Sequence, residues 1–137
     1  MTALLDEARL TTLLELYDIE RRRALLALFE EQARMGLEGI AQAAADGDGA
    51  AAAAAAHRLA SCAASFACAA LHARARQLAH PETQPTAVEL NEQREQLEML
   101  YVTSVKALHQ RLLKESPKRR MVKSWTPLPA QDTSPPE

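Results

Sequence analysis

Apolar residues recur at every third or fourth position along most of the chain, which is the spacing of an amphipathic helix. The clearest stretch follows Asp18, whose side chain is suited to cap the start of a helix. The residues predicted to face inward there are Leu25, Phe29, Ala33, Leu37, Ile40 and Ala44. Gly47-Asp48-Gly49 interrupts the pattern. The sequence therefore predicts one long helix between Asp18 and this break.

The same spacing and capping signals predict four further helices. A short helix follows Asp6, with Leu10, Leu13 and Leu14 facing inward. A third begins at Asp48, consists almost entirely of Ala up to His57, and continues to about Phe66. A fourth runs from about Ala69 to Ala79 and stops at His80-Pro81. The last opens with the capping box Thr86-Ala-Val-Glu89, ends at Ser116-Pro117, and turns inward Leu90, Leu97, Leu100, Tyr101, Ser104, Leu108 and Leu112.

These helices predict an all-α protein. Short connections make neighbouring helices antiparallel, so we expect an up-and-down antiparallel four-helix bundle with an additional short N-terminal helix. The composition agrees, because 47% of the residues are apolar, only 4% are aromatic, and the 137 residues include 4 Gly. The glycine-rich phosphate-binding motifs GxGxxG and GxxxxGK[ST] do not occur.

Charge and proline divide the chain into two parts. Residues 1–115 carry 12 basic and 16 acidic side chains and form the predicted bundle. Residues 116–137 carry four basic and two acidic side chains together with five of the 7 prolines. We expect this second part to be a flexible, basic, Pro-rich tail. An alternative is that Lys118–Trp125 is a linear motif that packs on the bundle or on a partner through Met121 and Trp125.

Overall charge and cysteine content exclude several classes of protein. The net charge of −2 does not favour nucleic acid as a partner. Two cysteines cannot form a disulfide framework, so a reducing compartment is the simpler interpretation. The N-terminus lacks the pattern of a secretory signal, and no apolar run reaches the length that crosses a bilayer. We therefore expect a cytoplasmic protein that does not enter a membrane.

His57 lies on an unusual face of the third predicted helix. On a helical wheel, Leu59 and Phe66 fall opposite His57, so we expect them in the core and the imidazole outside. The neighbours of His57 one turn away are all small: Ala53, Ala54, Ala60, Ser61 and Ala64. Such a low, weakly apolar surface lets another protein approach the nucleophilic imidazole closely. The alternative interpretation is that an Ala-rich run simply favours helix and that His57 is incidental.

The segment from His57 to Leu71 resembles the signature of histidine-containing phosphotransfer (HPt) domains, Ala-His-x-Leu-Lys-Gly followed by Gly-Ala and a Leu-containing helix. The matching residues are Ala56, His57, Leu59, Phe66 and Leu71. Upstream, Leu16-Tyr-Asp, the Leu25…Phe29 stripe and Ala-Ala-Asp-Gly-Asp are also similar to the family. The resemblance covers residues 4 to about 115, with the same order of helices.

The resemblance implies a function for His57. It would accept a phosphoryl group from a receiver-domain aspartate and return it to another, which makes the chain a monomeric phosphocarrier rather than an independent enzyme. The implied partners are receiver domains of a hybrid sensor kinase and of a response regulator. The chain would need no cofactor of its own, since Mg²⁺ is expected on the receiver.

This chain departs from the family pattern at three positions. The family's Lys is Ala60, its first Gly is Ser61 and its second Gly is Ala67. Arg58 is the adjacent cation, about 100° round the helix from His57, and it completes the predicted docking surface. Two alternatives therefore stay open: a module that binds receivers without transferring phosphate, and a helical structural or chaperone-like adaptor.

The remaining basic and metal-ligating residues receive simpler interpretations. A solvated face is the simpler interpretation of the run Arg21-Arg22-Arg23 and of Arg74 and Arg76. The alternative is that basic residues steer an acidic partner toward His57, and Arg74 and Arg76 are the better candidates for this. Cys62 and Cys68 lie about 240° apart on a continuous helix, so we predict buried thiols and no metal site. Cys68 and His72 could pair, but two ligands do not make a site. His80 and His109 are expected at the surface or at helix edges.

Overall fold

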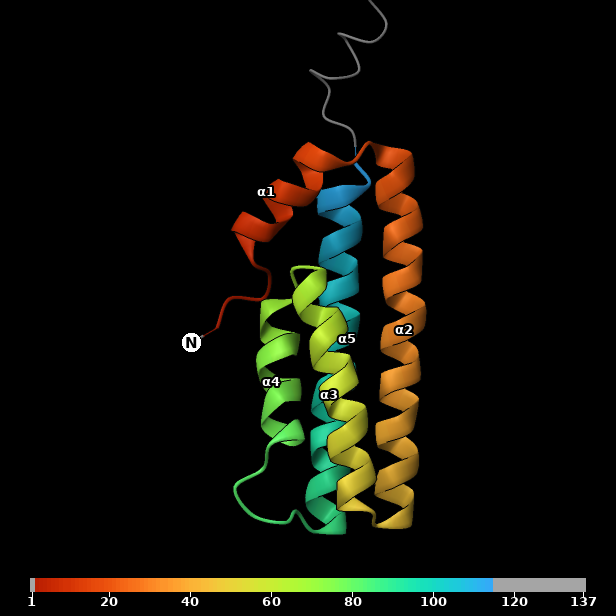
Figure 1. Cartoon of the computed structure of the whole chain (residues 1–137), viewed down its shortest axis with the longest axis vertical. Coiled ribbons are helices and arrows are strands. Elements are labelled where there is room, and N and C mark those ends of the chain that lie inside the picture. The colour runs from red at the N-terminus through yellow and green to blue at the C-terminus, as the bar shows by residue number, and fades with distance from the viewer. Residues whose placement is uncertain (1, 115–137) are drawn as a thin grey trace, which may run out of the picture.

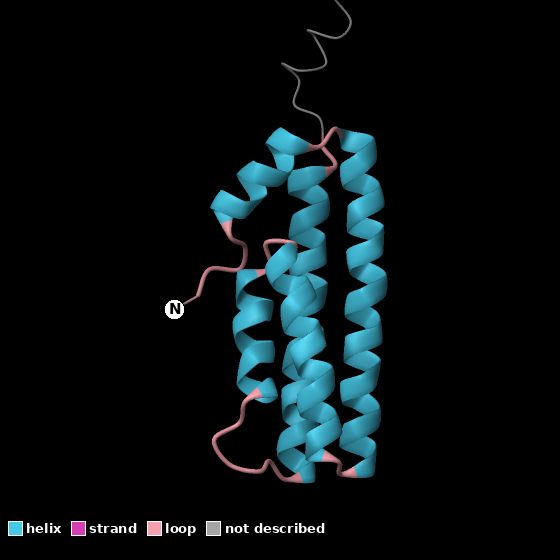
Figure 2. Cartoon of the chain, in the orientation of Figure 1, coloured by secondary structure: helices cyan, strands magenta, loops and turns pink. Residues whose placement is uncertain are grey.

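The computed structural model describes residues 2–114, and within them it contains five α-helices and no β-strand. The helices are α1 (Glu7–Leu16), α2 (Ile19–Asp46), α3 (Gly49–Ser65), α4 (Ala69–Ala79) and α5 (Ala87–Leu112). Figure 1 shows α2 to α5 lying alongside one another, with α1 tilted across one end. Figure 2 shows the short loops that join them. The predicted all-α class is confirmed, whereas the predicted tail at 116–137 lies outside the described residues.

Helix starts follow the predicted capping residues. The side chains of Asp6, Asp18 and Asp48 each accept a hydrogen bond from the backbone N–H three residues further on, at 3.2, 2.8 and 3.0 Å. At α5, Thr86 Oγ1 accepts from Glu89 N at 3.1 Å, while Glu89 Oε1 accepts from Thr86 N at 2.8 Å. Each cap satisfies a backbone donor that the helix itself leaves unpaired. The helix boundaries are thus encoded by local sequence.

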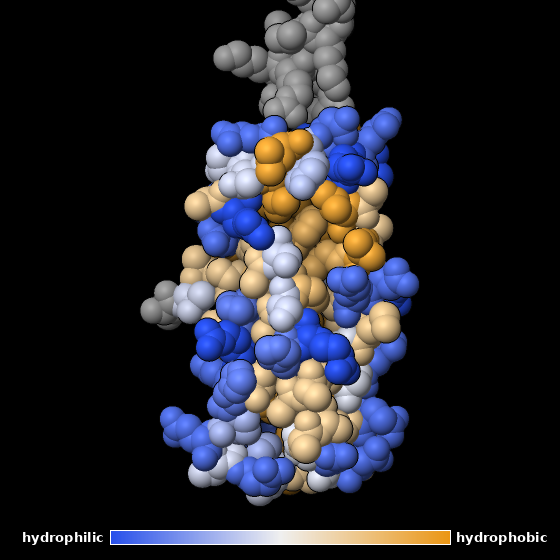
Figure 3. Space-filling model, in the orientation of Figure 1, coloured by the Kyte–Doolittle hydropathy of each residue, from blue (hydrophilic) through white to orange (hydrophobic). Residues whose placement is uncertain are grey.

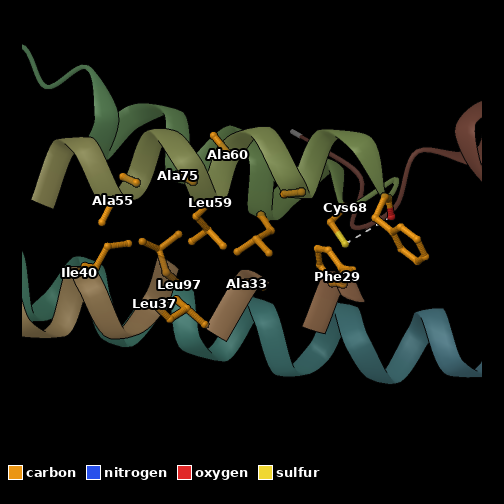
Figure 4. Packing of buried hydrophobic residues seen from close by; sticks show 14 of the residues in the cluster. Phe29, Ala33, Leu37, Ile40, Ala55, Leu59, Ala60, Cys68, Ala75 and Leu97 are labelled. Carbon is orange, nitrogen blue, oxygen red and sulfur yellow. Dashed lines mark hydrogen bonds between the residues drawn. The ribbon is translucent and has the colours of Figure 1, made fainter. Parts of the chain in front are cut away.

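The core is built from the apolar stripes of all five helices. Leu59 of α3 is fully buried, and Figure 4 shows it pointing toward Leu37 and Ile40 of α2. Near α1, the rings of Phe29 and Phe66 stack with centroids 5.2 Å apart and an interplanar angle of 10°. Four residues predicted to face inward are only half-buried: Leu14, Leu25, Leu100 and Tyr101. They lie at the edges of the stripes, where one side of each side chain stays open.

The basic run at the start of α2 does not lie wholly on a solvated face. Arg21 and Arg23 are exposed, but Arg22 is only 2% exposed. Position 22 lies one turn before Leu26 and two turns before Phe29, on the face of α2 that enters the core. The prediction of a solvated face is therefore wrong for Arg22, because helix phase rather than charge decides which side chain turns inward.

The N-terminal segment is held against the turn between α3 and α4. Asp6 N donates to Ala67 O at 2.8 Å, and Ala70 N donates to Leu4 O at 3.2 Å. Ala67 has a φ of 66°, the left-handed conformation that glycine adopts most readily. The backbone shape expected of a glycine is therefore present with alanine at this position. Directly after this segment, at the first residue of α1, Arg111 of α5 donates to both carboxylate oxygens of Glu7 at 2.9 and 2.7 Å.

Of the two thiols predicted to be buried, only Cys68 is fully so. Cys68 is fully buried, and its Sγ donates to Phe66 O at 3.6 Å (Figure 4). Cys62 is half-buried, and its Sγ lies 3.4 Å from Leu59 O. Burial raises the pKa of Cys62 to about 11 and that of Cys68 to about 12, from an ordinary value of 9.0. Both thiols are therefore protonated in the folded protein at neutral pH.

We expect the free energy of unfolding to fall as the pH rises from 9 toward 12. A pKa that is higher in the folded state means that the stabilisation is complete below pH 9, where both states hold the proton. Above pH 9 the unfolded chain gains by ionising its thiols while the folded chain does not. Urea titrations between pH 7 and pH 11 measure this slope. The control is a variant with both Cys62 and Cys68 replaced by Ala, in which Tyr101 is retained; an equal slope in that variant would contradict the prediction.

Candidate functional site

His57 stands on the exposed side of α3, opposite the side that enters the core. Its side chain is exposed, whereas Leu59 is 0% and Phe66 is 8% exposed. The structure therefore confirms the helical-wheel prediction for these three residues. In Figure 3 the face that carries α3 is mostly pale orange, the colour of weakly apolar residues, between blue patches. The imidazole is accessible to a partner without any movement of the core.

A shallow groove runs beside His57 toward α2. Gln32, Met35 and Gly36 of α2 line it together with His57, Arg58, Ser61, Cys62 and Ser65 of α3. The two helices approach closely here because both carry small residues. A Cβ added at Gly36 would lie 3.2 Å from Leu59 Cβ, and one at Gly39 would lie 3.1 Å from Ala55 Cβ. This close approach keeps the floor of the groove low.

Arg58 projects to the α2 side of His57. Its Nη2 atom would lie 3.8 Å from a Cβ placed on Gly39 of α2, and its side chain is exposed. The wheel places it about 100° away from His57, in agreement with this direction. Arg58 thus brings one positive charge to the groove, on the side facing α2.

Ala60 does not belong to the exposed surface, which corrects the prediction made for it. It is only 4% exposed, and Figure 4 shows it on the opposite side of α3 from Leu59. His72 of α4 lies over this position and donates its Nδ1–H to Ala60 O at 2.9 Å. The helical-wheel prediction assumed that α3 buries one face only. Because α3 packs extensively against both α2 and α4, its buried face is wider than that prediction allowed.

The other residues predicted around His57 remain accessible. Ala54, Ser61 and Ala64 are exposed, and Ala53 is half-buried. Ser61 Oγ donates to the backbone oxygen of His57 at 3.2 Å, so its hydroxyl lies flat against the helix. The surface beside His57 is therefore formed by small side chains along one face of α3.

Replacing Ala60 with Lys is expected to lower the free energy of unfolding by about 1–3 kcal/mol, the usual cost of forcing extra volume into a packed site. The larger side chain meets α4, where His72 bonds to the backbone of residue 60. Chemical denaturation measures the change. Ala54→Lys, on the exposed face of the same helix, is the matched control and should leave stability nearly unchanged. Equal stability of both variants would show that position 60 is open to solvent.

A second imidazole lies beside His57. The ring centroid of His80, the C-cap residue of α4, is 6.2 Å from that of His57, with an interplanar angle of 83°. The sequence analysis assigned His80 to the surface but did not connect it with His57. The signal that could have found it is the register of the α3–α4 hairpin: the two histidines stand at comparable distances before and after the turn at Ala67.

The two arginines predicted to steer a partner differ in exposure. Arg76 is exposed in the last turn of α4, and its backbone oxygen accepts a hydrogen bond from His80 N at 3.0 Å. Arg74 is half-buried. Arg76 is thus one turn away from the residue that contacts His57, and steering by either arginine remains a prediction.

Acidic side chains gather near His80. A polar hollow at the α4–α5 connection is lined by His80, Glu82, Glu89 and Glu92, among others. Within residues 2–114 no group of three or more His, Cys, Asp or Glu side chains is arranged to hold a metal ion. In the same range no helix is both long and apolar enough to cross a membrane.

Comparison with known proteins places this helical region in a family. The model of the Hpt domain matches residues 24–114, which extend from the second turn of α2 to the end of the described chain and include His57. Helix α1 precedes the matched range. Comparisons with curated proteins and with solved structures gave no significant match.

Proposed function

The chain belongs to the Hpt domain family, and from this premise we propose that it is a phosphorelay intermediate that carries a phosphoryl group on His57. The observation that carries the proposal is the exposure of one imidazole on a face of small side chains, opposite the buried Leu59 and Phe66. A receiver domain needs this access, because its phosphorylated aspartate must come within bonding distance of a ring nitrogen.

The transfer is a substitution at phosphorus. An unprotonated ring nitrogen of His57 donates its lone pair to the phosphorus of the receiver's aspartyl phosphate, and a nitrogen–phosphorus bond forms. The bond between phosphorus and the carboxylate oxygen breaks, and the aspartate leaves with the electron pair. The proton on the other ring nitrogen can pass to water. In the reverse step, the ring takes back a proton from water and a second receiver's aspartate attacks the phosphorus. The nitrogen–phosphorus bond breaks, and His57 leaves with the electron pair as neutral imidazole.

The two proteins contribute different parts of the chemistry. Phosphoryl transfer requires positioning and neutralisation of charge. The receiver is expected to bring the aspartate and Mg²⁺, whereas this chain brings the imidazole and the surface around it. It is therefore a phosphocarrier rather than an independent catalyst.

The proposed partners are receiver domains of a hybrid sensor kinase and of a response regulator. They would dock on the exposed residues around His57, namely Ala53, Ala54, Arg58, Ser61 and Ala64. Arg74 and Arg76 would steer an acidic partner, since complementary charge speeds encounter. We further propose that the protein acts as a monomer in the cytoplasm.

The functional domain in this proposal comprises residues 1–115. Within it, α2 to α5 would form an up-and-down antiparallel four-helix bundle. The extensive α2–α3 and α3–α4 contacts support that arrangement.

A second candidate function is a module that binds receivers without carrying phosphate. The observation that favours it is the alanine at position 60, which is buried beneath α4 and supplies no cation to a phosphoryl group. Such a protein would keep the docking surface and lose the transfer.

One labelling experiment tests the proposal. The chain is incubated with a panel of phosphorylated receiver domains, and the transferred phosphate is tested for its stability. Label on the chain that is lost in acid and kept in base identifies phosphohistidine and supports transfer. Tight binding without label would favour the second candidate, and neither binding nor label with any receiver would contradict both.

A further inference from the structure

His80 is the residue of α4 whose ring contacts His57. The rings meet edge to face, with centroids 6.2 Å apart. His80 sits at a defined place, because its backbone N–H donates to Arg76 O at 3.0 Å and Pro81 follows it directly. Its side chain is exposed, so it can turn about its own bonds without disturbing the core. The pair thus brings a second nitrogen-bearing ring to the α4 side of His57.

A phosphoryl group on His57 requires hydrogen-bond donors or cations nearby, and the two sides of His57 differ in the groups that they offer. Its oxygens are anionic and are best stabilised by charge-assisted hydrogen bonds. Position 60, one turn from His57 on the α4 side, is a buried alanine. Arg58 projects toward Gly39 of α2, on the other side of His57. On the α4 side, a hydrogen-bond donor for the phosphoryl group can come from His80, whose ring contacts His57.

We propose that His80 is a positioning residue for phosphohistidine, whose ring N–H donates a hydrogen bond to a phosphoryl oxygen carried by His57. This inference rests on the proposed phosphotransfer function and goes beyond it by naming a second residue for the same site. The His80 side chain is exposed, so its ring can turn aside to admit a phosphoryl group on His57 and remain within hydrogen-bonding reach of it.

The charges around His80 give it a second effect. His80 also lines a hollow together with Glu82 of the loop and Glu89 and Glu92 of α5. On its own helix, Arg76 lies one turn earlier. A phosphoryl group on His57 would be repelled by these carboxylates, since like charges destabilise each other. A hydrogen bond from the His80 ring to a phosphoryl oxygen would offset this repulsion.

The test compares the lifetime of phosphohistidine in variants of the full chain. The protein is phosphorylated with a phosphoramidate salt, which transfers its phosphoryl group to imidazole and releases ammonia, so that no receiver is needed. The excess reagent is removed, and the decay of phospho-His57 is followed by ³¹P NMR with assignment of the modified residue by mass spectrometry. The variants are His80→Ala and His80→Lys, with His109→Ala on α5 as the matched control.

We expect His80→Ala to shorten the half-life about three- to tenfold, as for loss of one charge-assisted hydrogen bond, and His80→Lys to restore it. A purely structural role of His80 would not be rescued by lysine.

The outcomes separate this inference from the proposed function. Equal half-lives of the parent and His80→Ala, with His57 labelled in both, would overturn the role of His80 and leave the proposed function standing. A shorter half-life that lysine does not restore would also overturn it. Absence of any label on His57 in the parent chain, from phosphoramidate and from receivers alike, would overturn the proposed function and this inference together.

Discussion

Replacing His57 with Gln is expected to abolish phosphate labelling of the chain by receiver domains. Gln has the reach and polarity of His but no ring nitrogen that can form a bond with phosphorus. Cys62 and Cys68 are poor replacements, because burial disfavours the thiolate and raises the pKa of both thiols, to about 11 and about 12. The readout is radiolabel on the chain after incubation with a phosphorylated receiver, and the expected loss is complete.

The same substitution should leave the fold intact. His57 is exposed, and Gln is at least as good a helix former, so the free energy of unfolding should change by no more than about 0.5 kcal/mol. Circular dichroism and urea denaturation check this. A loss of several kcal/mol would show that His57 supports the fold, and residual label on the variant would place the phosphate on another residue.

Ser61→Glu and Ala64→Glu are each expected to weaken receiver binding on the order of a hundredfold, since like charge at an interface costs several kcal/mol. Both positions are exposed on the face of α3 that carries His57. Each substitution adds bulk to a surface of small side chains and places a negative charge opposite the acidic site of a receiver. Calorimetric titration with a cognate receiver measures the change directly.

A matched control separates this local effect from a change in net charge. Thr103→Glu makes the same exchange of a small hydroxyl side chain for a carboxylate on an exposed position of α5, a helix that packs mainly on α2 and α4. Its affinity for the receiver should stay within about twofold of the parent, as for exposed residues outside an interface. Equal weakening by all three variants would mean that receivers dock elsewhere, and the structural-adaptor interpretation would then be favoured.

The features that could be predicted from the sequence are those that depend on a few consecutive residues. Asp6, Asp18, Asp48 and Thr86 cap their helices as predicted because a cap needs only the residue itself and a backbone N–H three positions later. The exposure of His57 also followed from local information, since the large apolar residues of α3 mark the opposite face.

The features that could not be predicted depend on more than one neighbouring helix. Ala60 is buried because α3 is covered by both α2 and α4, and a wheel with one apolar direction cannot represent two interfaces. The contact between His57 and His80 depends on the register of two helices across the turn at Ala67, which hydrophobic spacing leaves undetermined. For the same reason, the sequence predicted the phosphate-accepting candidate but not the residue beside it.

The way α1 is attached predicts that it opens at a lower free-energy cost than α2 to α5 unfold. Besides backbone hydrogen bonds near its start, α1 and the residues just before it are held by the buried side chains of Leu5, Leu10 and Leu13. Two exposed polar contacts add to this, the ion pair between Glu7 and Arg111 and the hydrogen bond from Arg9 to Ser65 O at 3.4 Å. Exposed ion pairs contribute little net free energy, so burial of these leucines dominates. Local unfolding generally begins in segments with few buried contacts. Transient opening of α1 would therefore uncover the stacked Phe29 and Phe66 rings while α2 to α5 stay folded, and its amide hydrogens would exchange with solvent long before those of the core.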